Sequence, residues 1–146
     1  MKGIRTKKKS IRTKKKIKVK KLPTIKRLRN KLDKVFNTYI KLRDGKCILS
    51  GVTEELQCSH YYDKRNSPFL RWDERNAHAM AKSIHFRHHH GKAPDYSLWM
   101  VKKYDIVFLE KLSIDSYKKY DPKREDYNRL INHYIEKINV LKLKNN

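Results

Sequence analysis

Seven histidines give this chain its clearest capacity for chemistry, because imidazole is a common metal ligand and a natural general base near neutral pH. Six of the seven lie between positions 60 and 90, and the full set is His60, His78, His85, His88, His89, His90 and His133. His85 and His89 are four residues apart, and His88 is three residues from His85, so a helix would place either pair on one face. Such a pair can bind one metal ion. The alternative is a histidine-rich surface exposed to solvent.

The order and spacing of three residues, His60, Asn76 and His85, resemble the HNH or ββα-metal nuclease motif. The resemblance implies that His60 on a first strand is the general base and that Asn76 on a second strand orients its ring. It also implies that the following helix binds a catalytic Mg²⁺ or Mn²⁺ through His85 and His89, with His88 as the alternative ligand. A neutral imidazole can deprotonate the water that attacks a phosphodiester, and a metal ion can stabilise the leaving 3′ oxygen.

Three longer stretches carry a more specific signal: Arg43-Asp44-Gly45-Lys46-Cys47-Ile48-Leu49-Ser50-Gly51, Cys58-Ser59-His60-Tyr61-Tyr62 and Leu70-Arg71-Trp72-Asp73-Glu74-Arg75-Asn76-Ala77-His78. In this order they resemble the lambda NinG (Rap) family of phage recombination proteins, within the HNH nucleases, over about residues 18–112. The resemblance implies a structure-directed DNA endonuclease that cleaves branched recombination intermediates such as D-loops, forks and Holliday junctions. It also implies a phage or prophage product that acts in the cytoplasm of the bacterial host.

The chain departs from this family at its cysteines. Family members usually carry two Cys-x-x-Cys pairs that bind a structural zinc, and these pairs fall here on Cys47 with Ser50 and on Ala81 with Ile84. Three of the four ligands are missing, so we expect no structural zinc and expect packing in its place. Cys58 aligns with no family ligand, and we expect both cysteines to be buried thiols.

Several residues beside the motif have both a functional and a structural interpretation. Ser59, which precedes the expected base, is a poor metal ligand but can support the site. His78 lies two residues after Asn76, on the same strand face if the strand is regular, and either supports the site or is structural. Arg71 is expected near DNA and Arg75 in local ion pairs. Trp72 and Trp99 are expected in the core rather than stacked on bases.

The charge of the chain indicates a polyanionic partner. There are 38 Lys and Arg against 15 Asp and Glu, which gives a net charge of +23. Residues 1–30 contain no acidic residue, and we expect residues 1–22 to form a basic, disordered arm that contacts DNA phosphates. The lysines expected to make these contacts are Lys7, Lys8, Lys9, Lys14, Lys15 and Lys16. No apolar stretch is long enough to span a membrane, and no signal peptide is evident.

The periodicity of apolar residues predicts the elements that must position these groups. The expected helices are 24–43, 81–90, 96–104, 106–112 and 124–143. A strand with a tight loop is expected at 46–51, and further strands at 56–62 and 76–80. The fold class is therefore α+β, with a small ββα-metal (HNH) core at about 46–91, wrapped by the first helix and by C-terminal helices at about 95–143. Residues 23–146 are expected to form one nuclease domain.

Two other functions are compatible with the sequence. A non-catalytic nucleic-acid-binding protein with a degenerate HNH fold would keep the arm and the fold but would not cleave. An HNH nuclease that acts on linear duplex DNA would cleave without a need for branches. A homodimer is possible on junctions, because two symmetric cuts require two active sites.

Overall fold

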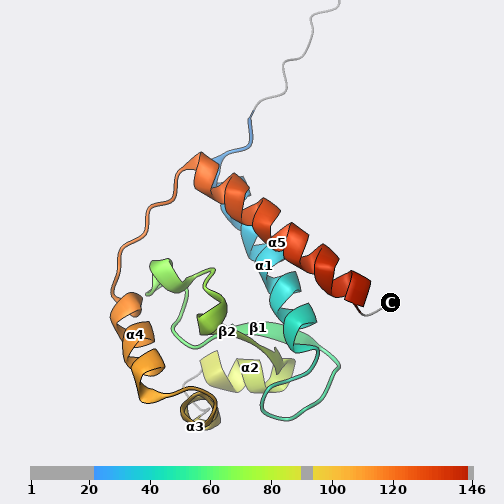
Figure 1. Ribbon diagram of the computed structural model, residues 1–146, viewed down its shortest axis with the longest axis vertical. Helices are drawn as coiled ribbons and strands as arrows, with labels where there is room; N and C mark the ends of the chain where they lie inside the picture. The colour runs from blue at the N-terminus through green and yellow to red at the C-terminus, as the bar shows by residue number, and fades with distance from the viewer. Residues whose placement is uncertain (1–21, 90–93, 145–146) are drawn as a thin grey trace, which may run out of the picture.

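The computed structural model describes residues 22–89 and 94–144 of the chain. It is mostly helical with one small sheet, which confirms the α+β class. The elements in chain order are α1 (Ile25–Asp44), β1 (Leu56–His60), the short 3-10 helices η1 (Pro68–Leu70) and η2 (Glu74–Asn76), β2 (Ala77–Ala81), α2 (Lys82–His89), α3 (Pro94–Lys103), α4 (Ile106–Ser116) and α5 (Arg124–Lys144) (Figure 1). The lysines assigned to the basic arm lie outside the described residues.

Helix α1 begins and ends where its sequence provides caps. The Thr24 side chain accepts a hydrogen bond from the Arg27 backbone N–H at 3.3 Å, which satisfies one of the free donors of the first turn. Gly45 follows the helix with φ 66°, a conformation that glycine adopts without steric cost, and its N–H donates to the Lys41 carbonyl at 3.0 Å. The predicted helix at 24–43 is thus confirmed.

The two strands form an antiparallel hairpin, and its register places two histidines on opposite faces. His60 pairs with Ala77, and Ser59 pairs with His78. Because neighbouring residues of a strand point to opposite faces, Ser59 and His78 share one face while His60 lies on the other. Helix α2 follows β2 directly and packs against both strands. The order strand, strand, helix is therefore present as the sequence predicted.

Two details of the connections differ from the sequence prediction. Residues 46–51 form a hydrogen-bonded turn instead of a strand, because Cys47 N–H donates to the Val52 carbonyl at 2.7 Å and Gly51 reverses the chain with φ 77°. Ile48 N–H donates to the Ala79 carbonyl at 3.0 Å, so the turn is fixed to β2. The connection between the strands contains η1 and η2, which apolar periodicity does not reveal because each is only three residues long.

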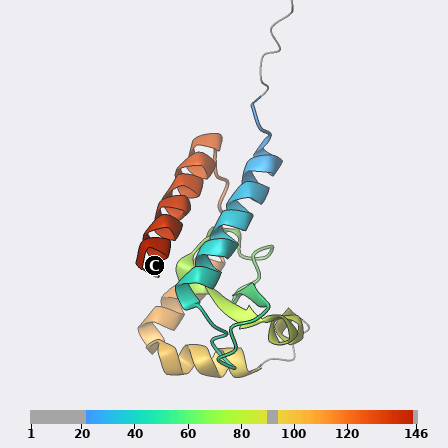
Figure 2. The same ribbon diagram turned by 90° about the vertical axis from the view of Figure 1, so that its right-hand side faces the viewer.

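The helices cover the hairpin from two sides. Helices α1 and α5 lie side by side, and their buried faces form one core cluster with Trp72 and Ala77 (Figures 1 and 2). Helices α3 and α4 contribute Tyr96, Met100 and Leu112 to a second cluster that includes Met80 of β2. The hairpin is therefore held between two cores. No helix within residues 22–89 and 94–144 is long and apolar enough to cross a membrane.

Three of the four positions at which the resemblance implied cysteine ligands lie in or against the second core cluster, and the fourth, Ser50, is exposed. Cys47 and Ala81 are buried there, and Ile84 packs against them. The Ser50 N–H donates to Cys47 Sγ at 3.4 Å. Apolar packing and turn hydrogen bonds thus connect these four positions. Cys47 and Cys58 are both free thiols, Cys47 buried and Cys58 partly buried.

Candidate active site

His60 ends β1 with its ring almost completely buried. Its side chain is 7% exposed, and its ring lies 6.0 Å from the Phe36 ring of α1. The Nε2 atom donates a hydrogen bond to the Arg71 carbonyl at 2.9 Å. Because a carbonyl oxygen can only accept, this contact assigns the proton of the neutral ring to Nε2 and leaves the lone pair on Nδ1. Burial lowers the pKa of His60 to about 4, so the ring is neutral near pH 7.

The hydrogen bonds of the Asn76 side chain go to the backbone of the loop rather than to the His60 ring, which differs from the role that the HNH resemblance implied. Its amide nitrogen donates to the carbonyls of Tyr62 at 2.9 Å and Leu70 at 3.2 Å, and its side-chain oxygen accepts from Tyr62 N–H at 2.7 Å. Asn76 is fully buried, so it closes the loop between the strands from inside. Since Leu70 precedes Arg71, Asn76 positions the carbonyl that orients His60. The amide of Asn76 thus influences His60 indirectly, through the Arg71 carbonyl.

A second set of contacts fixes the same loop to α1. Arg71 forms a bidentate pair with the Asp33 carboxylate, with Nε–Oδ1 at 3.0 Å and Nη2–Oδ2 at 2.6 Å. Trp72 Nε1 donates to the same carboxylate at 2.9 Å. Burial raises the pKa of Asp33, but the hydrogen bonds and charge of Arg71 more than offset this, so the pKa lies below its ordinary value. The guanidinium of Arg71 is thus engaged within the protein, and its predicted role at DNA stays a prediction.

One histidine of α2, His88, lies against the end of β1. His88 Nε2 donates to the His60 carbonyl at 3.0 Å, and its ring lies 4.9 Å from the Tyr96 ring. His88 therefore attaches α2 to the strand that carries the expected base. His85 lies one turn earlier on α2 and is partly buried. The side chain of His89 and all of His90 lie outside the described residues.

The described residues alone do not complete a metal site. Within residues 22–89 and 94–144, no group of three or more His, Cys, Asp or Glu side chains is placed to hold a metal ion. One buried polar atom, Ser59 Oγ, lies on β1 next to His60 in the sequence. Ser59 is fully buried, and its Oγ has no hydrogen-bond partner within the described part of the chain. It precedes His60 on β1 and faces the opposite side of the hairpin.

His78 is enclosed on the Ser59 side of the hairpin. Its Nδ1 is 2.8 Å from the Tyr96 hydroxyl and its Nε2 is 3.1 Å from the Tyr104 hydroxyl, so both ring nitrogens have partners. The Trp99 ring lies 4.7 Å away. His78 is 2% exposed, and burial lowers its pKa to about 4. These contacts favour the structural interpretation of His78.

The remaining residues singled out from the sequence make local contacts. Arg75 donates to Asp73 and, through Nη2, to Asp115 of α4 at 2.9 Å, so it is ion-paired as predicted. Trp72 is buried in the first core cluster, as predicted. Trp99 is partly buried beside His78.

The roles of three residues of α1, Asp33 in its middle and Arg43 and Asp44 at its end, were not predicted from the sequence. Asp33 binds Arg71 and Trp72, as described above. Arg43 donates to the carbonyls of Glu74 at 2.9 Å and Ala77 at 2.8 Å, and Asp44 accepts from Ala79 N–H at 2.7 Å. The one available signal was that Asp33 is the only acidic residue in the run before Asp44.

Comparison with known proteins gives one match. The family described as Bacteriophage Lambda NinG protein matches residues 2–144 of the chain. Neither the curated proteins nor the solved structures include a match. The matched region contains the hairpin, α2 and all of the histidines.

Proposed function

The chain belongs to the bacteriophage lambda NinG protein family and is therefore a recombination-related phage protein, and on this basis we propose that it is a metal-dependent, structure-directed DNA endonuclease of the HNH type. Its substrates are branched recombination intermediates such as D-loops, forks and Holliday junctions. It acts in the cytoplasm of the host bacterium, on DNA that the basic residues of the first 22 positions help to hold.

The observation that carries this proposal is the arrangement of His60. Its Nε2 donates a hydrogen bond to the Arg71 carbonyl, with 2.9 Å between nitrogen and oxygen, so the lone pair of the neutral ring lies on Nδ1. The hairpin and α2 follow the strand, strand, helix order, and α2 is attached to the residue itself through His88. A buried ring with one fixed tautomer, on a residue whose backbone carbonyl is bound by a histidine of α2, supports the role of a general base.

The reaction proposed for this site is hydrolysis of a phosphodiester bond. His60 Nδ1 accepts a proton from the water that attacks the phosphorus, and the bond from phosphorus to the 3′ oxygen breaks. The Arg71 carbonyl keeps the ring in the correct tautomer, and it stabilises the imidazolium that forms. Asn76 and the Arg71–Asp33 pair keep that carbonyl in place.

A divalent cation, Mg²⁺ or Mn²⁺, is part of the proposal, and the residues fit it in part. His88 donates to the His60 carbonyl, so the ligands proposed from α2 are His85 and His89. Ser59 Oγ is buried on the face of β1 opposite to the His60 ring, so Ser59 is a supporting residue in this proposal and not a ligand of the ion. Two imidazoles leave open coordination positions for water and phosphate oxygens, and the bound ion would stabilise the charge on the leaving oxygen. A homodimer would bring two such sites to one junction.

The test compares cleavage of a four-way junction with cleavage of its linear duplex arms, with Mg²⁺, Mn²⁺, Zn²⁺ or no divalent ion. We expect the junction to be cut preferentially, and only with Mg²⁺ or Mn²⁺. His60→Ala should abolish cutting and retain junction binding, while His133→Ala, an exposed change on α5, serves as the matched control. Equal rates for wild type and His60→Ala would refute the role of His60. Equal cutting of the duplex arms would instead indicate a linear-duplex nuclease.

A second function, non-catalytic binding of nucleic acid, is supported by a specific observation. Asn76 and His88, which the HNH resemblance implied as the orienting residue and the alternative metal ligand, each make hydrogen bonds within the fold instead. A degenerate HNH fold that only binds DNA would retain these contacts. Binding of the junction without cleavage under every metal condition would favour this function over the first.

A further inference from the structure

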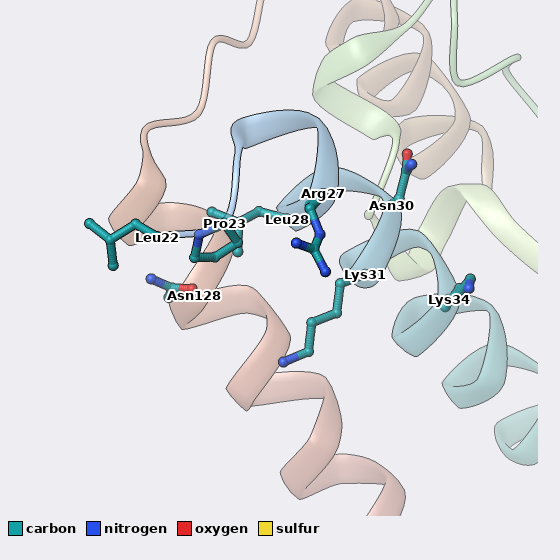
Figure 3. Close-up of a pocket in the computed structure, with 8 residues that line it drawn as sticks. All are labelled: Leu22, Pro23, Arg27, Leu28, Asn30, Lys31, Lys34 and Asn128. Atoms are coloured by element: carbon teal, nitrogen blue, oxygen red, sulfur yellow. The ribbon is translucent and has the colours of Figure 1, made fainter. Parts of the chain in front are cut away.

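A groove with basic walls lies where α1 and α5 begin. It has a volume of about 740 Å³. The groove is formed by the segment before α1, the first turns of α1 and one residue of α5 (Figure 3). The residues that line it are Leu22, Pro23, Arg27, Leu28, Asn30, Lys31, Lys34 and Asn128. This groove is separate from the candidate active site and includes none of its residues.

Two cationic side chains converge in this groove. Arg27 and Lys31 are four residues apart on α1, and in Figure 3 both extend to the same side of the helix, toward α5. The Asn128 side chain lies on α5 across from them. Lys34 follows one turn further along α1. The lining residues include no carboxylate, and no ion pair described within residues 22–89 and 94–144 involves Arg27, Lys31 or Lys34.

The backbone that carries these side chains is fixed by packing and hydrogen bonds. Leu28, which also lines the groove, and Leu32 are buried in the first core cluster between α1 and α5. Arg124, in the first turn of α5, donates to the Pro23 carbonyl and so joins the two helix starts. Thr24 caps α1 just before Arg27. A rigid pair of helices therefore presents a guanidinium, an ammonium group and an amide to one space.

We propose that this groove binds backbone phosphates of duplex DNA, as a contact site separate from the cleavage site. The proposal rests on the proposed function in that DNA is the substrate. Guanidinium and ammonium groups without internal carboxylate partners are suited to phosphate oxygens. Residues 1–21, which precede the groove in the chain, also include basic residues and no acidic ones. The same polyanionic partner therefore suits both this segment and the groove. Contacts of this kind position DNA without reading its bases.

The position of the groove predicts which phosphates it contacts. Arg27 lies nine residues before Phe36, whose ring faces His60, so the two are about 14 Å apart along the helix axis. That distance is about four nucleotides of duplex rise. For a duplex arm that runs along α1, the groove would therefore contact phosphates a few base pairs from the scissile phosphate, and its loss should lower affinity without changing the chemical step.

The test measures the salt dependence of DNA binding by the full chain without divalent metal. The probes are a 30-bp duplex and a four-way junction, titrated from 50 to 300 mM NaCl. The double variant Arg27→Gln/Lys31→Gln should reduce the slope of log affinity against log salt by about 1.8, since each neutralised phosphate contributes about 0.9. Lys111→Gln/Lys119→Gln, which removes two exposed lysines beyond the groove, is the matched control and should leave the slope unchanged.

The outcomes separate this inference from the proposed nuclease activity. An unchanged slope for Arg27→Gln/Lys31→Gln, with junction cleavage intact in the wild type, would overturn the groove and leave the nuclease. A reduced slope in a chain that never cleaves would retain the groove and refute the nuclease. Cleavage at saturating DNA should stay within twofold of wild type in the double variant. Tighter binding of a duplex RNA of the same sequence would overturn the assignment to DNA.

Discussion

His60 and His78 occupy the two faces of one hairpin and differ in a single respect that bears on function. Both are buried, and burial lowers the pKa of each to about 4. His78 has partners for both ring nitrogens, in Tyr96 and Tyr104. His60 has one described partner, the Arg71 carbonyl at Nε2. A shifted pKa thus reports burial for both rings, and the partners of the ring nitrogens distinguish them. Both nitrogens of His78 are engaged within the fold, whereas only Nε2 of His60 has a described partner, which suits the proposed role of His60 as the base.

The comparison predicts that substitution of His60 mainly affects the cleavage rate and that substitution of His78 mainly affects stability. The largest expected effect is the fall in cleavage rate. His60→Ala should lower the cleavage rate by about 100-fold to 10,000-fold, because a positioned general base contributes that much. His78→Gln should leave the rate of the folded protein within a few-fold, yet lower the free energy of unfolding by about 2–4 kcal/mol, since it disrupts the hydrogen bonds of the buried ring with the hydroxyls of Tyr96 and Tyr104. Single-turnover cleavage and urea unfolding of both variants measure the two effects.

The reverse pattern would break the comparison. If His78→Gln abolished cleavage at a temperature where circular dichroism shows it folded, the ring enclosed by tyrosines would belong to the catalytic machinery. A chemical control is available in Tyr104→Phe, which removes one phenol oxygen from His78 Nε2 and leaves the His60 side of the hairpin unchanged. It should follow His78→Gln in its effect on stability and not His60→Ala in its effect on rate.

Asn76 tests the comparison further, because its side chain supports His60 only through hydrogen bonds to the backbone of the loop. Asn76→Ala removes three buried hydrogen bonds to Tyr62 and Leu70 and should lower the free energy of unfolding by about 3 kcal/mol. The loop should then hold the Arg71 carbonyl less well, so cleavage should fall although Asn76 does not touch His60. The pH profile and rate of Asn76→Ala, measured where the variant is folded, test this.

Asn76→Asp provides the matched control for the loop. It keeps the oxygen that accepts from Tyr62 N–H but loses the two N–H donations and buries a charge, so it should not rescue stability. A variant with full stability and full activity would show that the loop is held by other contacts, such as the Arg71–Asp33 pair.

The sequence predicted most of the fold because its helices have strong apolar periodicity and clear caps. Thr24 and Gly45 mark the ends of α1, and the apolar positions of α5 recur over its whole length. The candidate site was predicted as a set of residue types, His60, Asn76 and the histidines of α2. Their hydrogen-bond partners could not be predicted, because Arg71 offers a backbone carbonyl that any residue would have. Likewise, Asp33 meets Arg71 only after the chain folds back across 38 positions.

The pH dependence of stability tests the statement that both rings are buried as neutral groups. Each has a folded-state pKa of about 4, below its ordinary value of about 6.5. The unfolded chain therefore binds more protons in this interval, so stability is complete above about pH 6.5 and falls as the pH drops toward 4. Each ring contributes a slope of about 1.4 kcal/mol per pH unit. Urea unfolding between pH 7 and 4.5 should show this slope halved in His78→Gln. The charged groups that act on the His78 ring, Arg43, Asp44 and Lys103, are retained in this variant.

An undiminished slope in His78→Gln would mean that the acid sensitivity arises elsewhere, for instance in the Asp33 carboxylate, whose pKa is lowered by Arg71. That group contributes stability that is lost only as the pH falls below about 4, the ordinary value for an aspartate. The interval between pH 6.5 and 4.5 therefore separates the histidines from the aspartate.

Substitution of Ser59 has the smallest expected effect on stability, and the response of the variant to Mn²⁺ distinguishes a packing role of Ser59 from a role in metal binding. Its Oγ is buried without a partner in the described part of the chain, so Ser59→Ala removes a desolvated hydroxyl and should raise the free energy of unfolding by up to about 1 kcal/mol. Ser116→Ala is the matched control, because Ser116 Oγ donates to the Ser113 carbonyl at 2.6 Å, and its loss should lower stability by a similar amount. If Ser59 Oγ contributes to the cation site, the rise in melting temperature on addition of Mn²⁺ should be smaller in Ser59→Ala and unchanged in Ser116→Ala. If Mn²⁺ stabilises the two variants equally, Ser59 has only a packing role, and any metal ligands must come from α2.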